Sequence, residues 1–170
     1  MNTNELSSAQ NPVDAPERLR PDKHQRILVV ENDVDIRRLI AGLLMDAGYH
    51  VVAAKDGAAA WNALQLVRYD LLVTDNGLPT LTGLGLLKRI HAAGLDLPVI
   101  MASGTLPVWD FSVFPWLRPR VMLPKPYTIL ELLGKVKDVL RITNRFPDKF
   151  PAPCWQSYLA PLSGTGGSKV

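Results

Sequence analysis

The sequence predicts a doubly wound α/β domain, in which five parallel strands are covered by helices on both faces. Five short apolar runs alternate with stretches of helical periodicity along residues 25–142. Parallel strands need crossover connections, and right-handed crossovers place helices on both sides of the sheet. With 170 residues, 47% of them hydrophobic, the chain can bury one full core and is too short for two ordinary domains.

The predicted strands are short runs that contain few polar side chains. They are Ile27–Val30, Val51–Ala54, Leu71–Thr74, Val99–Ala102 and Val121–Leu123. We expect them in the flavodoxin-like order 2-1-3-4-5. Strand five is then an edge strand, where Pro124 is tolerated although it lacks a backbone donor.

The segments between these runs place apolar residues at helical spacing. The predicted helices are Ile36–Ala47, which Gly48 can terminate, then Ala59–Leu66, Leu84–Ile90 and Ile129–Leu140, the last opened by a capping box of Thr128 and Glu131. The fourth helix should be shortened or irregular, because the prolines at 107, 115 and 119 leave room for at most about two helical turns. Within it, Phe111 and Phe114 have helical spacing and are expected in the core.

The two ends of the chain differ in composition from this central part. Residues 1–24 mix Asn, Ser, Pro and charged residues, and residues 143–170 contain four prolines and end in SGTGGSKV. We expect a flexible arm at 1–24, a domain at 25–142 and a Pro/Gly-rich tail at 143–170. The tail is too short and too rich in proline for a helix-turn-helix, so no DNA-binding domain is expected.

Composition also limits the compartment and the partners. The single cysteine, Cys154, cannot form an intramolecular disulfide, and no apolar stretch resembles a signal peptide or a membrane span. The net charge of +3 is spread out, without a compact basic stripe. The sequence therefore predicts a cytoplasmic protein that contacts neither membrane nor nucleic acid.

Chemically active residues follow four of the predicted strands. Glu31-Asn32-Asp33 follows strand one and Asp75 follows strand three, while Ser103 and Lys125 stand at the ends of strands four and five. In open α/β sheets the ligand crevice lies outside the carboxyl ends of the strands, so these groups should converge on one rim. Carboxylates brought together repel each other, and a hard divalent cation with oxygen ligands, Mg²⁺ above all, would relieve that repulsion.

Four segments give the chain a resemblance to a known family. "ILVVEND", "DLLVTDNGLPTLTG", "PVIMASG" and "LPKPY" occur in that order at the ends of the expected strands. Together they resemble the receiver domain of bacterial two-component response regulators. The resemblance implies that Asp75 is the phosphoacceptor and that Glu31, Asn32, Asp75 and the Gly77 carbonyl hold Mg²⁺. It further implies that Ser103 and Lys125 contact the phosphoryl group, and that Lys125–Pro126 is a cis peptide.

The resemblance also implies a function. A receiver takes a phosphoryl group from a histidine kinase or a phosphotransfer protein, with enzymatic activity limited to self-phosphorylation and self-dephosphorylation. Here we expect a single-domain regulator, a monomer or weak dimer, that signals by contact with an unknown downstream protein. Trp109, Trp116 and Met122 are the candidate output surface, with Met122 where active receivers often carry a switching aromatic residue.

Asn32 leaves an alternative open. Its amide can ligate Mg²⁺ but brings no charge to the second position of the acidic pair. The chain could then be a pseudo-receiver, a constitutive protein-interaction module without phosphorylation chemistry.

Overall fold

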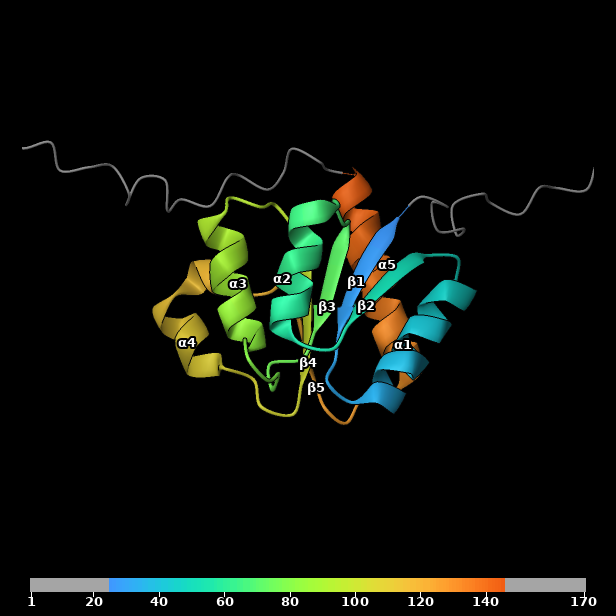
Figure 1. The fold of residues 1–170 in the computed structure, drawn as a ribbon, viewed down its shortest axis with the longest axis horizontal. Helices are drawn as coiled ribbons and strands as arrows, with labels where there is room; N and C mark the ends of the chain where they lie inside the picture. The colour runs from blue at the N-terminus through green and yellow to red at the C-terminus, as the bar shows by residue number, and fades with distance from the viewer. Residues whose placement is uncertain (1–24, 146–170) are drawn as a thin grey trace, which may run out of the picture.

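The structure, a computed structural model, describes residues 25–145 and contains one five-stranded parallel sheet (Figure 1). Its strands are β1 Arg26–Val30, β2 His50–Ala54, β3 Leu71–Thr74, β4 Val99–Ser103 and β5 Val121–Pro124. They lie in the order β2-β1-β3-β4-β5, and every neighbouring pair is parallel. The predicted fold class and strand order are confirmed, and Pro124 lies on an edge strand as expected.

Helices cover both faces of the sheet. They are α1 Val34–Asp46, α2 Gly57–Leu66, α3 Gly83–Ala92, α4 Val108–Val113 and α5 Ile129–Arg145, with a 3₁₀ turn, η2, at Pro115–Leu117. Figure 1 shows α1 and α5 on one side of the sheet and α2, α3 and α4 on the other. Because successive side chains of a strand point to opposite faces, β1 contributes Ile27 and Val29 to the core under α1 and α5, and Leu28 and Val30 to the other core.

Side-chain caps fix where these helices begin. The Asp33 carboxylate accepts from the backbone of α1, and the Thr82 hydroxyl accepts from Gly85 in α3. At α5, Thr128 N donates to Glu131 Oε2 at 2.6 Å, and Glu131 N donates to Thr128 Oγ1 at 3.2 Å. This is the predicted capping box, although α5 continues past the predicted end at residue 140 to Arg145.

The fourth helix is short, as the prolines predict. Phe111 is buried in the core, but Phe114 is 38% exposed, so its predicted place in the core is wrong. The helix ends at Val113 and the backbone of Phe114 turns away, with φ −123° and ψ 74°. Helical spacing therefore no longer applies, and the Phe114 ring contacts Trp116 instead, with ring centroids 5.8 Å apart.

Two predicted segments fall largely beyond this fold. The arm at 1–24 and the tail after residue 145 lie outside the described residues. Within residues 25–145, none of the helices has the length and apolar character needed to cross a membrane.

Candidate functional site

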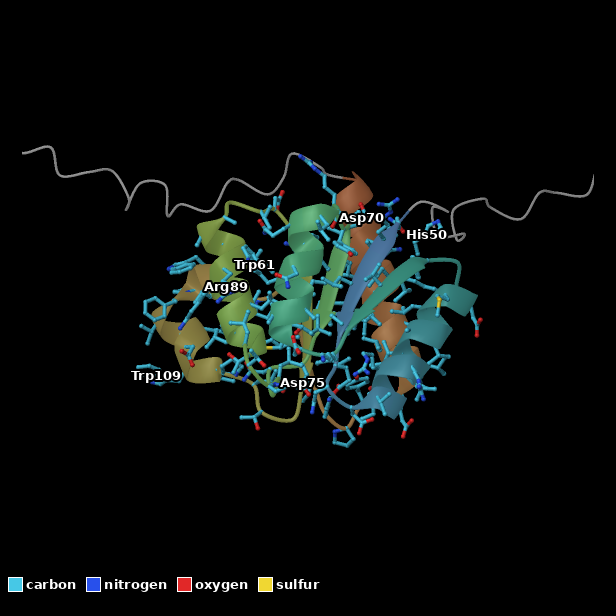
Figure 2. The ribbon with its side chains drawn as sticks, in the orientation of Figure 1. His50, Trp61, Asp70, Asp75, Arg89 and Trp109 are labelled. Carbon is cyan, nitrogen blue, oxygen red and sulfur yellow. The ribbon has the colours of Figure 1, made fainter. Side chains whose placement is uncertain are left out.

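The candidate site lies at the carboxyl end of the sheet. Parallel pairing sets Val30 beside Thr74 and Ser103 beside Pro124, so the residues that end or follow these strands share one rim. Figure 2 shows Asp75 at this end of the sheet, opposite His50 and Asp70. The structure therefore brings together the acidic, hydroxyl and ammonium groups that the sequence places after four strands.

Lys125 joins the two carboxylates of the rim. Its Nζ donates to Glu31 Oε2 at 2.7 Å and to Asp75 Oδ2 at 2.7 Å. Burial lowers the pKa of Lys125, but the hydrogen bonds and negative charges of the two carboxylates outweigh burial and raise it well above its usual range. Lys125 is therefore a permanent cation at neutral pH, and its peptide bond to Pro126 is cis as predicted.

Asp75 is held by donors on both oxygens. Its Oδ1 accepts from Ser103 Oγ at 2.5 Å and from Gly77 N at 2.9 Å, while Oδ2 accepts from Lys125. Burial raises the pKa of Asp75, but the hydrogen bonds from Lys125, Ser103 and Gly77 prevail, so that the net pKa lies below the ordinary value. The side chain is thus an ionised carboxylate at neutral pH, the form that can act as a nucleophile.

The Ser103 hydroxyl points into the site. Ser103 is buried, and its Oγ accepts from Thr105 N at 3.3 Å while it donates to Asp75. The resemblance implies that this hydroxyl contacts the phosphoryl group. In the structure it already bonds the carboxylate that would receive that group.

Only two of the four predicted metal ligands, Glu31 and Asp75, are carboxylates. The Glu31 side chain is 5% exposed, whereas Asn32 is exposed. Asp33, the remaining acid of this loop, accepts from Asp35 N and Ile36 N, and these bonds lower its pKa. Asp33 is therefore engaged through Oδ1 as the cap of α1.

The donor types nevertheless suit Mg²⁺. Two carboxylates, an amide oxygen and a backbone carbonyl are all hard oxygen donors. In the part of the chain that the structure describes, no group of three or more His, Cys, Asp or Glu side chains is arranged to hold a metal ion. The predicted ligands therefore fit a dication by their chemistry, and two of them are carboxylates.

Two residues of the rim were missed by the sequence analysis. The Arg37 Nη1 donates to the carbonyls of Glu31 at 2.7 Å and Asn32 at 3.1 Å, which fixes the loop that carries them. The other is Asn76, whose amide bonds two different segments next to Asp75. Arg37 lies near the start of α1, where the helix dipole disfavours a positive charge. This unfavourable position is the signal in the sequence that could have pointed to a role for Arg37.

The candidate output residues lie along and beneath α4. Trp109 is 75% exposed and points away from the sheet in Figure 2, and Trp116 in η2 is partly exposed. Met122 is half-buried and packs against the core on the α2 and α3 side of the sheet. The two tryptophans thus offer apolar surface to solvent, whereas Met122 is partly covered by the core.

Comparison with known proteins gives one consistent family. The family model of the response regulator receiver domain matches residues 27–137. The response regulator receiver protein CpdR of Brucella abortus is 32% identical over 116 residues, which cover 68% of this chain and 97% of that protein. The two-component response regulator-like protein PRR73 of rice is 38% identical over 105 residues, which cover 59% of this chain but only 14% of the rice protein.

Solved structures agree with the sequence matches. The receiver domain of the Francisella response regulator 1452 shares 27% identity and a TM-score of 0.64, over 70% of this chain and 98% of that one. The response regulator TrrA of Thermotoga maritima, solved in complex with Mg²⁺-BeF, has 27% identity and a TM-score of 0.60, over 68% and 98% of the two chains. The family model, the relatives and the fold agree, and the chain belongs to the response regulator receiver domains of two-component signalling.

Proposed function

We propose that this receiver accepts a phosphoryl group on Asp75 from the phosphohistidine of a histidine kinase or a phosphotransfer protein. The observation that carries the proposal is the convergence on Asp75 of the Lys125 ammonium, at 2.7 Å, and the Ser103 hydroxyl, at 2.5 Å. A carboxylate with a lowered pKa, an adjacent cation and a hydroxyl donor are the groups that phosphoryl transfer to an aspartate requires.

The chemical step is a displacement at phosphorus. A carboxylate oxygen of Asp75 forms a bond to phosphorus, the bond between phosphorus and the imidazole nitrogen breaks, and its electron pair stays on the imidazole. The transition state is loose, so positioning and positive charge provide most of the catalysis. Lys125 supplies charge on the Oδ2 side, and Ser103 turns from the carboxylate to donate to a phosphoryl oxygen.

Mg²⁺ would be held by Glu31, Asn32, Asp75 and the Gly77 carbonyl. When bound, the ion supplies positive charge that offsets the charge of the phosphoryl oxygens and helps orient the phosphoryl group. Glu31 is buried and bonded to Lys125, so the first carboxylate is held ready for this role. That the similar protein TrrA was solved in complex with Mg²⁺-BeF supports the choice of Mg²⁺.

The output is proposed to be a protein contact. Receiver domains are signalling modules rather than ordinary enzymes, and here self-phosphorylation and self-dephosphorylation would be the whole of the enzymology. We infer a cytoplasmic, single-receiver regulator, a monomer or weak dimer, that passes its signal to a downstream protein through the surface around Trp109 and Trp116. The exposure of both tryptophans supports this choice of surface.

A constitutive interaction module is the second candidate. It is favoured by Asn32, which brings no charge, and by Lys125, whose ammonium lies 2.7 Å from both Glu31 and Asp75 and offsets one of their two charges. Such a rim would be stable without metal and would present one unchanging surface. The two candidates differ in a single measurable event, the gain of a phosphoryl group.

Intact-mass measurement after incubation with Mg²⁺ and acetyl phosphate tests the proposal. Wild type should gain one phosphoryl group, and Asp75→Asn should gain none. Asp70→Asn is the matched control, because Asp70 lies at the opposite end of the sheet, where it accepts from Arg26 N at 2.7 Å, and it should be labelled like wild type. Wild type that stays unlabelled at saturating donor would favour the constitutive module.

A further inference from the structure

Asn76, directly after the phosphoacceptor, connects two segments that are distant in sequence. Its Oδ1 accepts from Leu84 N at 3.0 Å, and its Nδ2 donates to the Thr105 carbonyl at 3.3 Å. Its own carbonyl accepts from Gly83 N at 3.2 Å. One residue therefore links the acceptor loop to the start of α3 and to the loop between β4 and α4.

On the α3 side, Asn76 is held by hydrogen bonds and by close packing of the backbone. The first backbone N–H groups of a helix have no partner inside the helix. In α3, Asn76 accepts hydrogen bonds from the N–H groups of Gly83 and Leu84, and Thr82 Oγ1 accepts from Gly85 N at 3.1 Å. The backbone also packs closely here, since a Cβ on Gly83 would lie 2.3 Å from the Asp75 carbonyl oxygen. Asn76 is therefore anchored to a helix that is itself fixed against Asp75.

The other side of the link reaches the residue that positions Ser103. Thr105 N donates to Ser103 Oγ at 3.3 Å, Ser103 Oγ donates to Asp75 Oδ1, and the Thr105 carbonyl accepts from Asn76. Since Asn76 follows Asp75 in the chain, these bonds form a closed ring through Asp75, Ser103, Thr105 and Asn76. The bond from the Asn76 amide to the Thr105 carbonyl is the link that closes the ring.

We propose that Asn76 is a positioning residue, which holds residues 104–107 against the acceptor loop so that the Ser103 hydroxyl stays directed at Asp75. With the loop held, the Ser103 hydroxyl stays within reach of a phosphoryl group on Asp75. The positioning itself is a property of the protein without phosphate. Its effect on phosphoryl transfer rests on the proposed function.

Amide hydrogen exchange tests the positioning. Asn76→Ala removes both side-chain bonds, whereas Asn76→Asp keeps an acceptor for Leu84 N and replaces the donor to Thr105 by a charged acceptor. Exchange in residues 104–109 should be roughly two- to tenfold faster in both variants, the factor expected for one net hydrogen bond. Exchange at Leu84 should rise in the alanine variant alone, and Asn62→Ala, at an exposed asparagine of α2, should match wild type throughout.

A double-mutant cycle tests whether Asn76 acts through Ser103. Asn76→Ala should slow labelling of Asp75 by acetyl phosphate in the wild-type background and have no further effect in Ser103→Ala. Wild-type exchange at 104–109 in both Asn76 variants, or equal slowing with and without Ser103, would overturn the proposal. If wild type takes no phosphoryl group at all, the proposed function fails, and the exchange pattern still decides the positioning.

Discussion

Asn32 is the residue at which this rim has least charge. It stands exposed between Glu31, which is bonded to Lys125, and Asp33, whose Oδ1 caps α1. The uncharged amide should make Mg²⁺ binding weaker than a second carboxylate would, because each added negative charge strengthens the attraction for a dication.

We predict that Asn32→Asp tightens Mg²⁺ binding by about tenfold, the order expected for one more charge at contact distance in water. Calorimetric titration of both proteins measures the change, and Asn62→Asp, which adds the same charge on α2, should leave the affinity unaltered. Equal affinities for wild type and Asn32→Asp would mean that Glu31 or Asp33 already supplies the missing charge.

The lowered pKa of Asp75 makes stability depend on acid pH. A carboxyl group with a folded-state pKa below its unfolded value stabilises the fold at pH values above the unfolded pKa, and that stability is lost as the pH falls through the folded pKa. Protonation removes the charge that Lys125, Ser103 and the Gly77 N–H stabilise.

Urea unfolding between pH 7 and pH 3 should show this loss. The free energy of unfolding of wild type should decrease towards acid pH more steeply than that of Asp75→Asn, which cannot titrate at this position. The two curves should run parallel above the ordinary aspartate range. Parallel curves through the acid range as well would show that the bonds to Asp75 do not stabilise its ionised form.

At the scale of elements, α4 separates a core face from a solvent face within two residues. Phe111 is 6% exposed and Trp109 is 75% exposed, although both belong to the same short helix. Phe111→Ala should therefore lower the free energy of unfolding by about 3 kcal/mol or more. Trp109→Ala should change it by less than about 0.5 kcal/mol and leave Asp75 labelling intact. Similar large losses in both variants would place Trp109 in the core and exclude it from an output surface.

Two glycines at helix positions should respond to alanine in opposite directions. Gly134 lies inside α5, and a Cβ added there would have nothing within 4 Å, so Gly134→Ala should stabilise the protein by about 1 kcal/mol. Gly83, at the start of α3, would place its Cβ 2.3 Å from the Asp75 carbonyl oxygen, and Gly83→Ala should destabilise by roughly 1–3 kcal/mol. Thermal unfolding of both variants checks the pair, and a neutral Gly83→Ala would mean that α3 is not held tightly against the acceptor loop.

At the scale of the whole molecule, the sheet was predictable because its strands are nearly uninterrupted apolar runs. The central strands β1, β3 and β4 are buried on both faces and need such runs. All of the observed strands begin and end within about one residue of the predicted bounds. The rim followed from the sheet, since the carboxyl ends of parallel strands meet on one side. The predicted convergence of Asp75, Glu31, Ser103 and Lys125 is confirmed by their hydrogen bonds.

The features that the sequence did not predict are contacts between segments and the exact ends of helices. Asn76 resembles an ordinary turn residue, and its role appears only when residue 105 comes within reach of its amide. Phe114 lies outside the core because α4 ends one residue before it, so its helical spacing from Phe111 does not hold in the structure. The cap of α5 could be predicted, because the Thr128–Glu131 capping box has a local sequence signature. The cap of α1 could not, because Asp33 stands where a metal ligand is equally consistent with the sequence.

The central claim, that Asp75 receives the phosphoryl group, can be tested at the level of the modified atom. After labelling with Mg²⁺ and acetyl phosphate, borohydride reduces an aspartyl phosphate to the alcohol, which leaves homoserine at the modified position. Peptide mass spectrometry should find homoserine at residue 75 of wild type and at no position of Asp75→Asn. Homoserine at another aspartate, or an unmodified Asp75 in labelled protein, would contradict the assignment of Asp75 as the phosphoacceptor.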